Sequence, residues 1–337
     1  YEISECLVGS EMCIRDRFCM VIKMNLTNDE KHYNTLANYY FNKYHEKVAK
    51  ISLNAGFSCP NKDGKKGYGG CTYCSKSGSG DFAGSPNDDL KTQFLSIKKV
   101  IAKKWPKTLY IPYLQANTNT YGDIDRLEKI YNELLNLDPN VVEISIATRA
   151  DCLENEKINL LSEINKKIPV QIELGLQTSN EKTAKIINRG STNKELIDAV
   201  KRLREKNIEV VIHIMNGLPN ENEDDMLNTI DFINSLDIQG IKIHSLCILK
   251  NTKMGDDYLK KPWPLLILEE YIKITVNQIR HLRSDIIIHR LSADADLSDL
   301  IAPLWTRKKL VVMNEIDKLM RKYNYYQGDQ FKKGHSS

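Results

Sequence analysis

Residues 59–74 read Cys59-Pro60-Asn61-Lys62-Asp63-Gly64-Lys65-Lys66-Gly67-Tyr68-Gly69-Gly70-Cys71-Thr72-Tyr73-Cys74 and place three cysteines in a glycine-rich loop. Cys71 and Cys74 form a Cys-x-x-Cys pair, whose two sulfurs can converge on one metal centre. The glycines of the longer spacer allow the turns that bring Cys59 back to the same place. A strand expected at residues 48–52 precedes the loop. The cysteines therefore lie at the carboxyl end of a strand, where α/β folds carry their chemistry.

The number of cysteines in this loop limits the kind of metal site. A structural zinc site has four ligands, and an ordinary [4Fe–4S] cluster takes four thiolates. A [4Fe–4S] cluster held by three thiolates leaves one iron open to an exogenous ligand. The alternative is a zinc site that Cys247 or a histidine completes, because Cys-x-x-Cys is common in zinc sites.

Length, charge and cysteine use describe an ordinary globular chain. Its 337 residues suffice for one α/β barrel-like domain with appendages, and its net charge of +4 is mild. No apolar run reaches the length of a membrane span, so we expect no membrane partner. The eight cysteines lack the regular spacing of a disulfide framework. Free thiols that serve a metal favour a reducing compartment, so we expect a cytoplasmic location.

Residues 1–19 differ in character from the rest of the chain. They lack the basic start and continuous apolar core of a signal peptide. They resemble a translated sequencing adapter, so we expect a non-native extension and a native start at Met20 or Met24. A genuine disordered extension is the alternative.

The middle of the chain alternates apolar, β-branched strands with helices, which favours a parallel sheet. The six expected strands cover residues 48–52, 108–114, 141–147, 170–176, 209–214 and 240–246. Six units are too few for a closed eight-stranded barrel. We therefore predict an α/β fold with a partial, TIM-like (β/α)6 barrel over residues 48–250. A helical segment at residues 20–47 is expected to pack over its open side, and residues 251–337 form a C-terminal α/β extension.

The last helix of that extension is basic. From residue 307 to the end, the chain has eight lysines and arginines against three acids, together with Tyr323, Tyr325 and Tyr326. Basic and aromatic side chains of this kind can contact RNA phosphates and bases. A solvated helix face is the simpler interpretation.

With three cysteines after the first strand of such a fold, the chain resembles the radical S-adenosylmethionine (SAM) superfamily. It is most similar to the YhcC-type proteins, which are related to the radical-SAM catalytic subunit of Elongator. The resemblance covers about residues 28–328. It is carried by the segments at residues 33–35, 54–61, 115–121, 173–178, 240–244, 288–291 and 302–305.

The resemblance implies roles for single residues. Cys59, Cys71 and Cys74 would bind a [4Fe–4S] cluster, and Tyr73 would shield it and cover the adenine of SAM. The remaining contacts with SAM would come from Gln115, Asn117 and Thr118 at its amino group, Gln177 at its ribose, Arg189 at its carboxylate and Gly217 at its adenine. The alternative role of Arg189 is to cap helix-end carbonyls, and that of Gln177 is to satisfy backbone groups at a strand end.

Further polar residues follow the expected strands and would face the mouth of the barrel. They are either structural or in contact with SAM or substrate. They are Arg149, Asp151, His244, His289 and Arg290. Cys247 is either a buried small residue or a redox partner of the site. His213 stands where some relatives carry an acid near the ribose, so that contact is not assigned to it.

The resemblance implies an enzyme that reductively cleaves SAM and generates a 5′-deoxyadenosyl radical. An electron donor such as flavodoxin or ferredoxin would reduce the cluster. The substrate is not identified; tRNA is one hypothesis, because of the basic tail and the similarity to the Elongator subunit. A small metabolite is a second hypothesis, and a non-enzymatic, zinc-stabilised RNA-binding module is a third.

Overall fold

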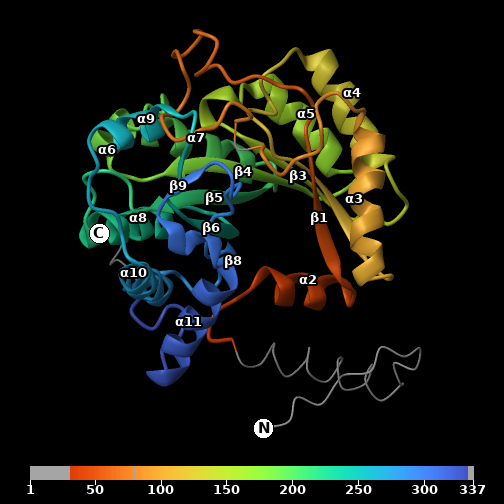
Figure 1. Ribbon diagram of the computed structural model, residues 1–337. Helices are drawn as coiled ribbons and strands as arrows, with labels where there is room; N and C mark the ends of the chain where they lie inside the picture. The colour runs from red at the N-terminus through yellow and green to blue at the C-terminus, as the bar shows by residue number, and fades with distance from the viewer. Residues whose placement is uncertain (1–30, 79, 333–337) are drawn as a thin grey trace.

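The computed structural model describes residues 31–78 and 80–332, and its centre is a curled parallel sheet of seven strands (Figure 1). The expected extension at residues 1–19 and the choice of Met20 or Met24 as the start lie outside the described residues. Neighbouring strands in the sheet are parallel throughout. Their spatial order is β1 (Val48–Leu53), β2 (Leu109–Leu114), β3 (Ile144–Thr148), β4 (Val170–Gln177), β5 (Glu209–Asn216), β6 (Gly240–Ser245) and β8 (Ile287–Arg290). The predicted partial barrel is confirmed.

Helices connect the strands and cover the outer face of the sheet (Figure 1). Between β1 and β6 they are α3 (Leu90–Lys104), α4 (Ile124–Leu135), α5 (Asn155–Asn165), α6 (Glu181–Ile186), α7 (Asn193–Arg204) and α8 (Glu223–Asn234), with a 3-10 turn at Ala150–Cys152. The later helices are α9 (Lys253–Lys260), α10 (Leu268–His281) and α11 (Lys309–Lys322), with a 3-10 turn at Leu304–Arg307. A small antiparallel pair, β7 (Ile248–Leu249) and β9 (Leu300–Ala302), follows β6.

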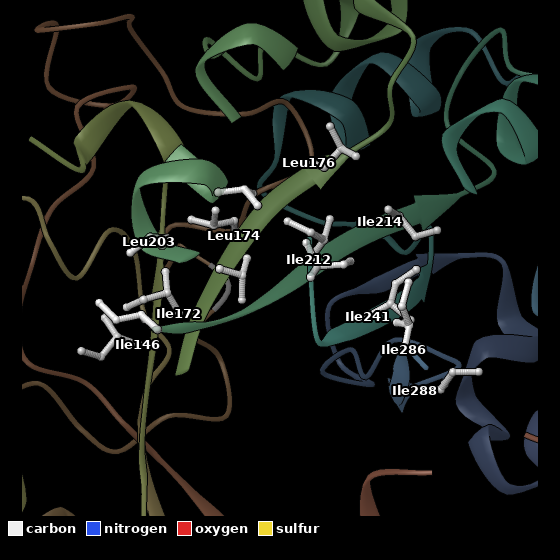
Figure 2. Close-up of a cluster of buried hydrophobic side chains, with 14 of the residues drawn as sticks. Ile146, Ile172, Leu174, Leu176, Leu203, Ile212, Ile214, Ile241, Ile286 and Ile288 are labelled. Carbon is white, nitrogen blue, oxygen red and sulfur yellow. The ribbon is translucent and has the colours of Figure 1, made fainter. Parts of the chain in front are cut away.

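The hydrophobic core lies between the outer face of the sheet and the helices (Figure 2). In β4, Ile172, Leu174 and Leu176 are fully buried in this core. Successive side chains of a strand point to opposite faces, so the residues between them point into the barrel. Those residues are Glu173 and Gly175, which line an internal cavity together with Gln177 at the end of the strand. The alternation therefore gives the barrel an apolar outer layer and a polar interior.

The sheet has one strand more than the sequence predicts for residues 48–250. A short strand is expected at residues 285–289, but as part of the extension. The structure pairs β8 in parallel with β6 and adds it to the barrel sheet. The reason is the hydrophobic pattern of β8, in which Ile288 packs into the same core as Ile241 of β6 (Figure 2).

The N-terminal helix α2 (Leu36–Tyr44) crosses the opening between the first and last strands, as predicted (Figure 1). Asn34 lies just before α2, and its carbonyl accepts a hydrogen bond from the amide of Ile288 in β8 at 2.8 Å. The phenol of Tyr40 donates to Glu143 at 2.9 Å, just before β3. Helix α2 thus covers the barrel at the amino-terminal ends of its strands.

Helix α11 is part of the core. Its buried residues include Val312, Ile316 and Met320, and the helix packs against α10. After it, the ring of Tyr325 lies 3.7 Å from the guanidinium of Arg280, and Tyr326 stacks on His32 at 4.1 Å. Two of the three tail tyrosines are therefore packed against the protein.

We expect deletion of residues 307–337 to unfold the protein. Each of the three buried aliphatic side chains of α11 contributes about 1.5–3 kcal/mol. Their combined loss is a large part of the stability of an ordinary domain. The measurement is urea unfolding followed by circular dichroism, with deletion of residues 333–337 as the control. An unchanged, cooperative transition in the longer deletion would contradict this assignment.

Candidate functional site

One cavity of about 680 Å³ runs through the barrel interior, from the cysteine loop at the carboxyl ends of the strands to helix α2. All strands of the seven-stranded sheet contribute residues to its wall. Cys59, Cys71 and Cys74 line it together. The structure thus brings the three predicted ligands to one end of a single internal space.

The cysteine loop is held against the segment that follows α6. Asn61 is fully buried, and its amide nitrogen donates a hydrogen bond to the carbonyl of Asn188 at 2.6 Å. In return, the side chain of Asn188 donates to the carbonyl of Gly70 at 2.7 Å. The amide of Thr72 donates to the carbonyl of Ile187 at 3.0 Å. These contacts fix the loop although it has no regular secondary structure.

The surroundings of Cys71 favour the thiolate, which is the form that binds metals. A hydrogen bond with Cys74 lowers the pKa of Cys71 to about 6, against the opposing effect of burial. The charge of Arg149 and hydrogen bonds from Tyr73 and Asn61 act in the same direction. The donor set therefore fits a metal centre made of thiolates.

The alternative zinc site would need a fourth ligand beside the three cysteines. Burial raises the pKa of Cys247 to about 11 and that of Cys152 to about 12, which disfavours their thiolates in the metal-free protein. Within residues 31–78 and 80–332, no three His, Cys, Asp or Glu side chains are arranged closely enough to hold one metal ion. Four ligands must lie within bonding distance of a single zinc ion, whereas an iron–sulfur cube is larger and keeps its thiolates farther apart.

Most residues predicted to contact SAM lie on the cavity wall near the cysteines. These are Tyr73, Gln115, Asn117, Thr118, Gln177 and Arg189. Gly217 is not among the lining residues, although its neighbour Met215 is. A Cβ atom at Gly217 would meet the side chain of Leu266 at 3.3 Å. The positive φ of +87° and this close packing explain a glycine here without a contact to a ligand.

Two of these wall residues have an uncommon backbone conformation. Asn117 and Gln177 both have a φ of +59°, in the left-handed region. Asparagine adopts this region readily, but glutamine does so at a cost. At Gln177 the pairing of β4 with β5 shifts its register. Asn117 is held by Lys62, whose ammonium donates to its amide oxygen at 3.0 Å. Such strained positions are frequent at binding sites.

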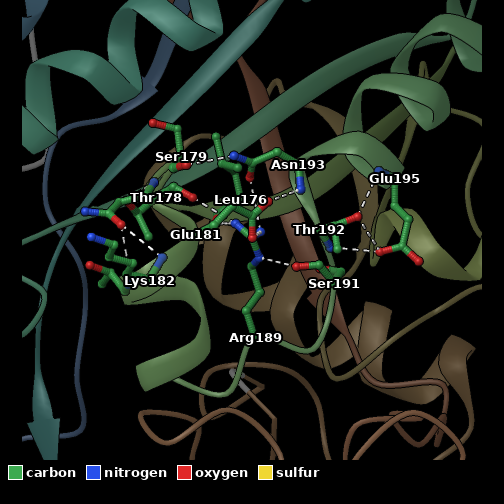
Figure 3. A network of polar contacts seen from close by, with 12 residues as sticks. Leu176, Thr178, Ser179, Glu181, Lys182, Arg189, Ser191, Thr192, Asn193 and Glu195 are labelled. Atoms are coloured by element: carbon green, nitrogen blue, oxygen red, sulfur yellow. Dashed lines mark hydrogen bonds and ion pairs between the residues drawn. The ribbon is translucent and has the colours of Figure 1, made fainter.

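Arg189 requires a correction to the role that the resemblance implies. All five N–H groups of its buried guanidinium have protein acceptors (Figure 3). The acceptors are the carbonyls of Leu176, Thr178 and Ser191 and the side chains of Glu181 and Asn193. No donor is left for the carboxylate of SAM. The structure therefore favours the alternative, in which Arg189 satisfies carbonyls and joins the end of β4 to α6 and α7.

Arg149 is the guanidinium whose charge acts on the cysteines. It forms a two-pronged ion pair with Asp151, with both distances 2.9 Å, and donates to the carbonyl of Arg189 at 2.7 Å. The sequence left open whether Arg149 and Asp151 are structural or contact a ligand, and the structure pairs them with each other. Its positive charge also interacts with Cys59 and Cys71. Arg149 therefore stabilises the ionised form of Cys71.

Deeper in the cavity, polar residues form a group that we call the inner cluster: Lys50, Ser145, Glu173, His213 and Lys242. The carboxylate of Glu173 accepts from Lys50 at 2.7 Å, Ser145 at 2.8 Å, His213 at 2.7 Å and Lys242. Burial alone would raise the pKa of Glu173, but Lys242 and Lys50 hold it well below its usual range. The sequence analysis missed all but His213. A charged residue at alternate positions of an apolar strand is the signal that could have identified them.

Glu221 gives the protein a pH-dependent stability. Burial raises the pKa of this carboxyl to about 7, although Thr178 donates a hydrogen bond to it. The native state therefore holds this proton more tightly than the unfolded state does. The resulting stabilisation is present at low pH and is lost as the pH rises from the ordinary value of 4.5 to about 7.

Glutamine stays neutral at every pH, so Glu221→Gln should abolish the decrease in stability between about pH 4.5 and pH 7. We expect the variant to be more stable than the wild type at about pH 8 by on the order of 2 kcal/mol. Urea unfolding of the metal-free protein at about pH 5 and pH 8 measures the effect. Glu163→Gln on the surface of α5 is the control. A stability difference between variant and wild type that is the same at both pH values would contradict the assignment.

Comparison with known proteins agrees with this geometry. A family model described as the Radical SAM superfamily matches residues 64–233, and one described as the Radical_SAM C-terminal domain matches residues 238–322. YtqA of Bacillus subtilis is 41% identical over 91% of this chain and 95% of its own length. YhcC of Escherichia coli is 32% identical over 83% of this chain and 90% of its own length.

The solved structure of the archaeal Methanocaldococcus infernus Elp3 with an N-terminal deletion shares the fold. Its TM-score is 0.63 at 15% identity, over 84% of this chain and 64% of that chain. No helix in the described part of the chain is both long and apolar enough to cross a membrane. The family models and the two bacterial relatives confirm the resemblance found in the sequence, and the chain belongs to the radical SAM superfamily.

Proposed function

We propose that this protein is a radical SAM enzyme whose [4Fe–4S] cluster is held by Cys59, Cys71 and Cys74. The observation that carries the proposal is the convergence of these cysteines at one end of the internal cavity, in a chain of this family. When bound, the cluster and SAM would supply a 5′-deoxyadenosyl radical that removes hydrogen from an unreactive carbon.

The residues around the cysteines have separate tasks in this proposal. Arg149 keeps negative charge on the cysteine sulfurs, and Tyr73 covers Cys71 through its hydrogen bond. Polar groups of Gln115, Asn117, Thr118 and Gln177 face the same part of the cavity and would bind SAM. Helix α2 and the cysteine loop cover opposite ends of the cavity, which limits the access of water to a reactive intermediate.

The structure supports a small metabolite over tRNA as the substrate. The cavity continues past the cysteines into a buried polar interior, which suits a small polar molecule. Helix α11, which suggested RNA, uses its apolar face in the core, and Tyr325 and Tyr326 are stacked on other side chains. RNA binding by the exposed residues of this helix stays a separate prediction.

The electron donor would approach the cysteine loop from outside. Lys65, Lys66 and Tyr68 are exposed there, and Tyr68 is 82% accessible. Positive charges beside an aromatic ring suit transient docking of an acidic carrier such as flavodoxin or ferredoxin. Free thiolates in the loop also require a reducing compartment, which agrees with a cytoplasmic location.

We expect Cys71→Ala to abolish both iron binding and SAM cleavage. Anaerobically reconstituted wild type should bind about four irons per chain and release 5′-deoxyadenosine with a reductant. Cys152→Ala is the matched control, because Cys152 is buried outside the cavity wall. Iron analysis and chromatography of the products are the measurements. Continued release of 5′-deoxyadenosine by Cys71→Ala would refute the proposal.

Gly190→Ala should weaken cluster binding without removing any ligand. A Cβ atom at Gly190 would lie 2.6 Å from the amide oxygen of Asn61, which anchors the cysteine loop. Gly69→Ala is the matched control, since Gly69 also has a positive φ but no atom within 4 Å of the added Cβ. Both variants carry the same backbone strain.

The measurement is the iron content after reconstitution and the rate of iron loss to a chelator. We expect Gly190→Ala to lose iron faster than Gly69→Ala. If the two variants behave alike, the anchoring role of Asn61 is wrong.

A further inference from the structure

The inner cluster contains two lysines that differ in how their hydrogen bonds are used. The ammonium of Lys50 donates to Ser145 at 3.2 Å, to Gln171 at 2.7 Å and to Glu173 at 2.7 Å. These three acceptors use all its N–H groups. In the described part of the chain, the ammonium of Lys242 has a single hydrogen-bond acceptor, Glu173. Lys242 lines the cavity and therefore has two donors left for another molecule.

Arg290 adds a second cation beside Lys242. It is the register partner of Lys242 between β8 and β6, and its side chain also lines the cavity. Its positive charge acts on Lys242, His213 and His244, so the four side chains converge. One terminal nitrogen of the Arg290 guanidinium lies 3.2 Å from a carboxylate oxygen of Asp294. Among the described residues, Asp294 is the acid that forms an ion pair with Arg290. Asp294 is shared with Lys309 at 2.8 Å.

The histidines of this region do not offset the positive charge. Burial lowers the pKa of His213 to about 4 and that of His244 well below its usual range, so both rings are neutral. The Nε2 atom of His244 and the Nδ1 atom of His289 are buried, and no hydrogen-bond partner for them lies in the described residues. Both side chains line the cavity. Unpaired polar atoms of this kind usually have a missing partner.

The charge balance of the cavity favours a negatively charged ligand. Apart from the cysteines, seven positively charged and four negatively charged residues line it. In its inner part, Glu173 already accepts four hydrogen bonds, so it does not neutralise an additional cation. Two lysines share the single charge of Glu173. The burial of this excess positive charge is costly, and an anionic ligand would offset that cost.

We propose that Lys242, Arg290 and His244 bind an anionic group of the substrate, a carboxylate or a phosphate, on the cavity wall formed by β6 and β8. The identification of this ligand as substrate rests on the proposed function. Lys242 and Arg290 supply charge-assisted hydrogen bonds, and Arg290 can meet two oxygens at once. His244 completes the site with a neutral donor. Lys50 is not part of this anion site, because its three N–H groups already donate to Ser145, Gln171 and Glu173.

Anion binding to the cluster-loaded protein tests the proposal. Inorganic phosphate and acetate are titrated separately by calorimetry at constant ionic strength, with and without SAM. The wild type should bind at least one of them, and the anion that binds more tightly assigns the class of the substrate group. We expect Lys242→Met and Arg290→Gln each to weaken this binding at least tenfold.

Lys318→Met is the control, because it removes the same charge from an exposed position on α11. It should bind the anion as the wild type does. The side chain of Arg290 is 33% exposed, so Arg290→Gln remains a usable test if Lys242→Met does not fold. Absence of anion binding in the wild type, or binding in both cavity variants as tight as in the wild type, would overturn the proposal.

This test is independent of radical chemistry. Release of 5′-deoxyadenosine by the wild type is measured on the same preparation. If SAM is not cleaved but phosphate or acetate still requires Lys242 and Arg290, the proposed function fails and the anion site stands. If SAM is cleaved and neither anion binds, only the anion site fails.

Discussion

The buried carboxylate of Glu173 is the constraint on which the interior of this barrel depends. It lies on β4, and its partners come from β1, β3, β5 and β6. An ionised carboxylate in this position would be very unfavourable without them, because burial removes its hydration. The two lysines and the other donors replace that hydration and at the same time link five strands. The polar interior can therefore remain open without losing its structure.

The opposite end of the cavity depends on a different kind of contact. The cysteine loop has no ladder of hydrogen bonds, so its shape is set by side chains that satisfy backbone groups. Asn61 and Asn188 do this reciprocally between the loop and the turn after α6. Arg189 fixes the position of that turn, because its guanidinium donates to the carbonyls of Leu176 and Thr178 at the end of β4 (Figure 3). Arg189 thus supports the cysteines through the backbone.

The sequence predicted the barrel well, because strand and helix patterns are local. All six strands expected at residues 48–250 are present, and the three cysteines of the glycine-rich loop lie together on the cavity wall. The role of Arg189 could not be derived in this way. Its acceptors lie on β4, α6 and the turn before α7, and whether a guanidinium is already satisfied depends on their arrangement. A match to a family motif gives the position of a residue but not its contacts.

The inner cluster shows a second limit of the same kind. Lys50, Glu173 and Lys242 are far apart in the chain, and each alone is a polar residue within a strand. Only the folded sheet brings them together, with Lys50 and Lys242 both donating to Glu173. His213 is the register partner of Lys242. The seventh strand was missed as part of the sheet for a related reason. Its apolar residues indicate a strand that packs in a core, but they do not show that its neighbour is β6.

The two ends of the cavity offer different chemistry along one axis. In the proposed function, the cysteines, with Arg149 beside them, would hold the cluster that receives an electron. The inner end provides fixed donors where a charged substrate group can be held. A radical reacts with whatever carbon lies within reach, so selectivity must come from position. An anchor on β6 and β8, built on strands rather than loops, would fix that position with little freedom. In the proposed function, the barrel would therefore select the reacting carbon by holding a distant charged group of the substrate.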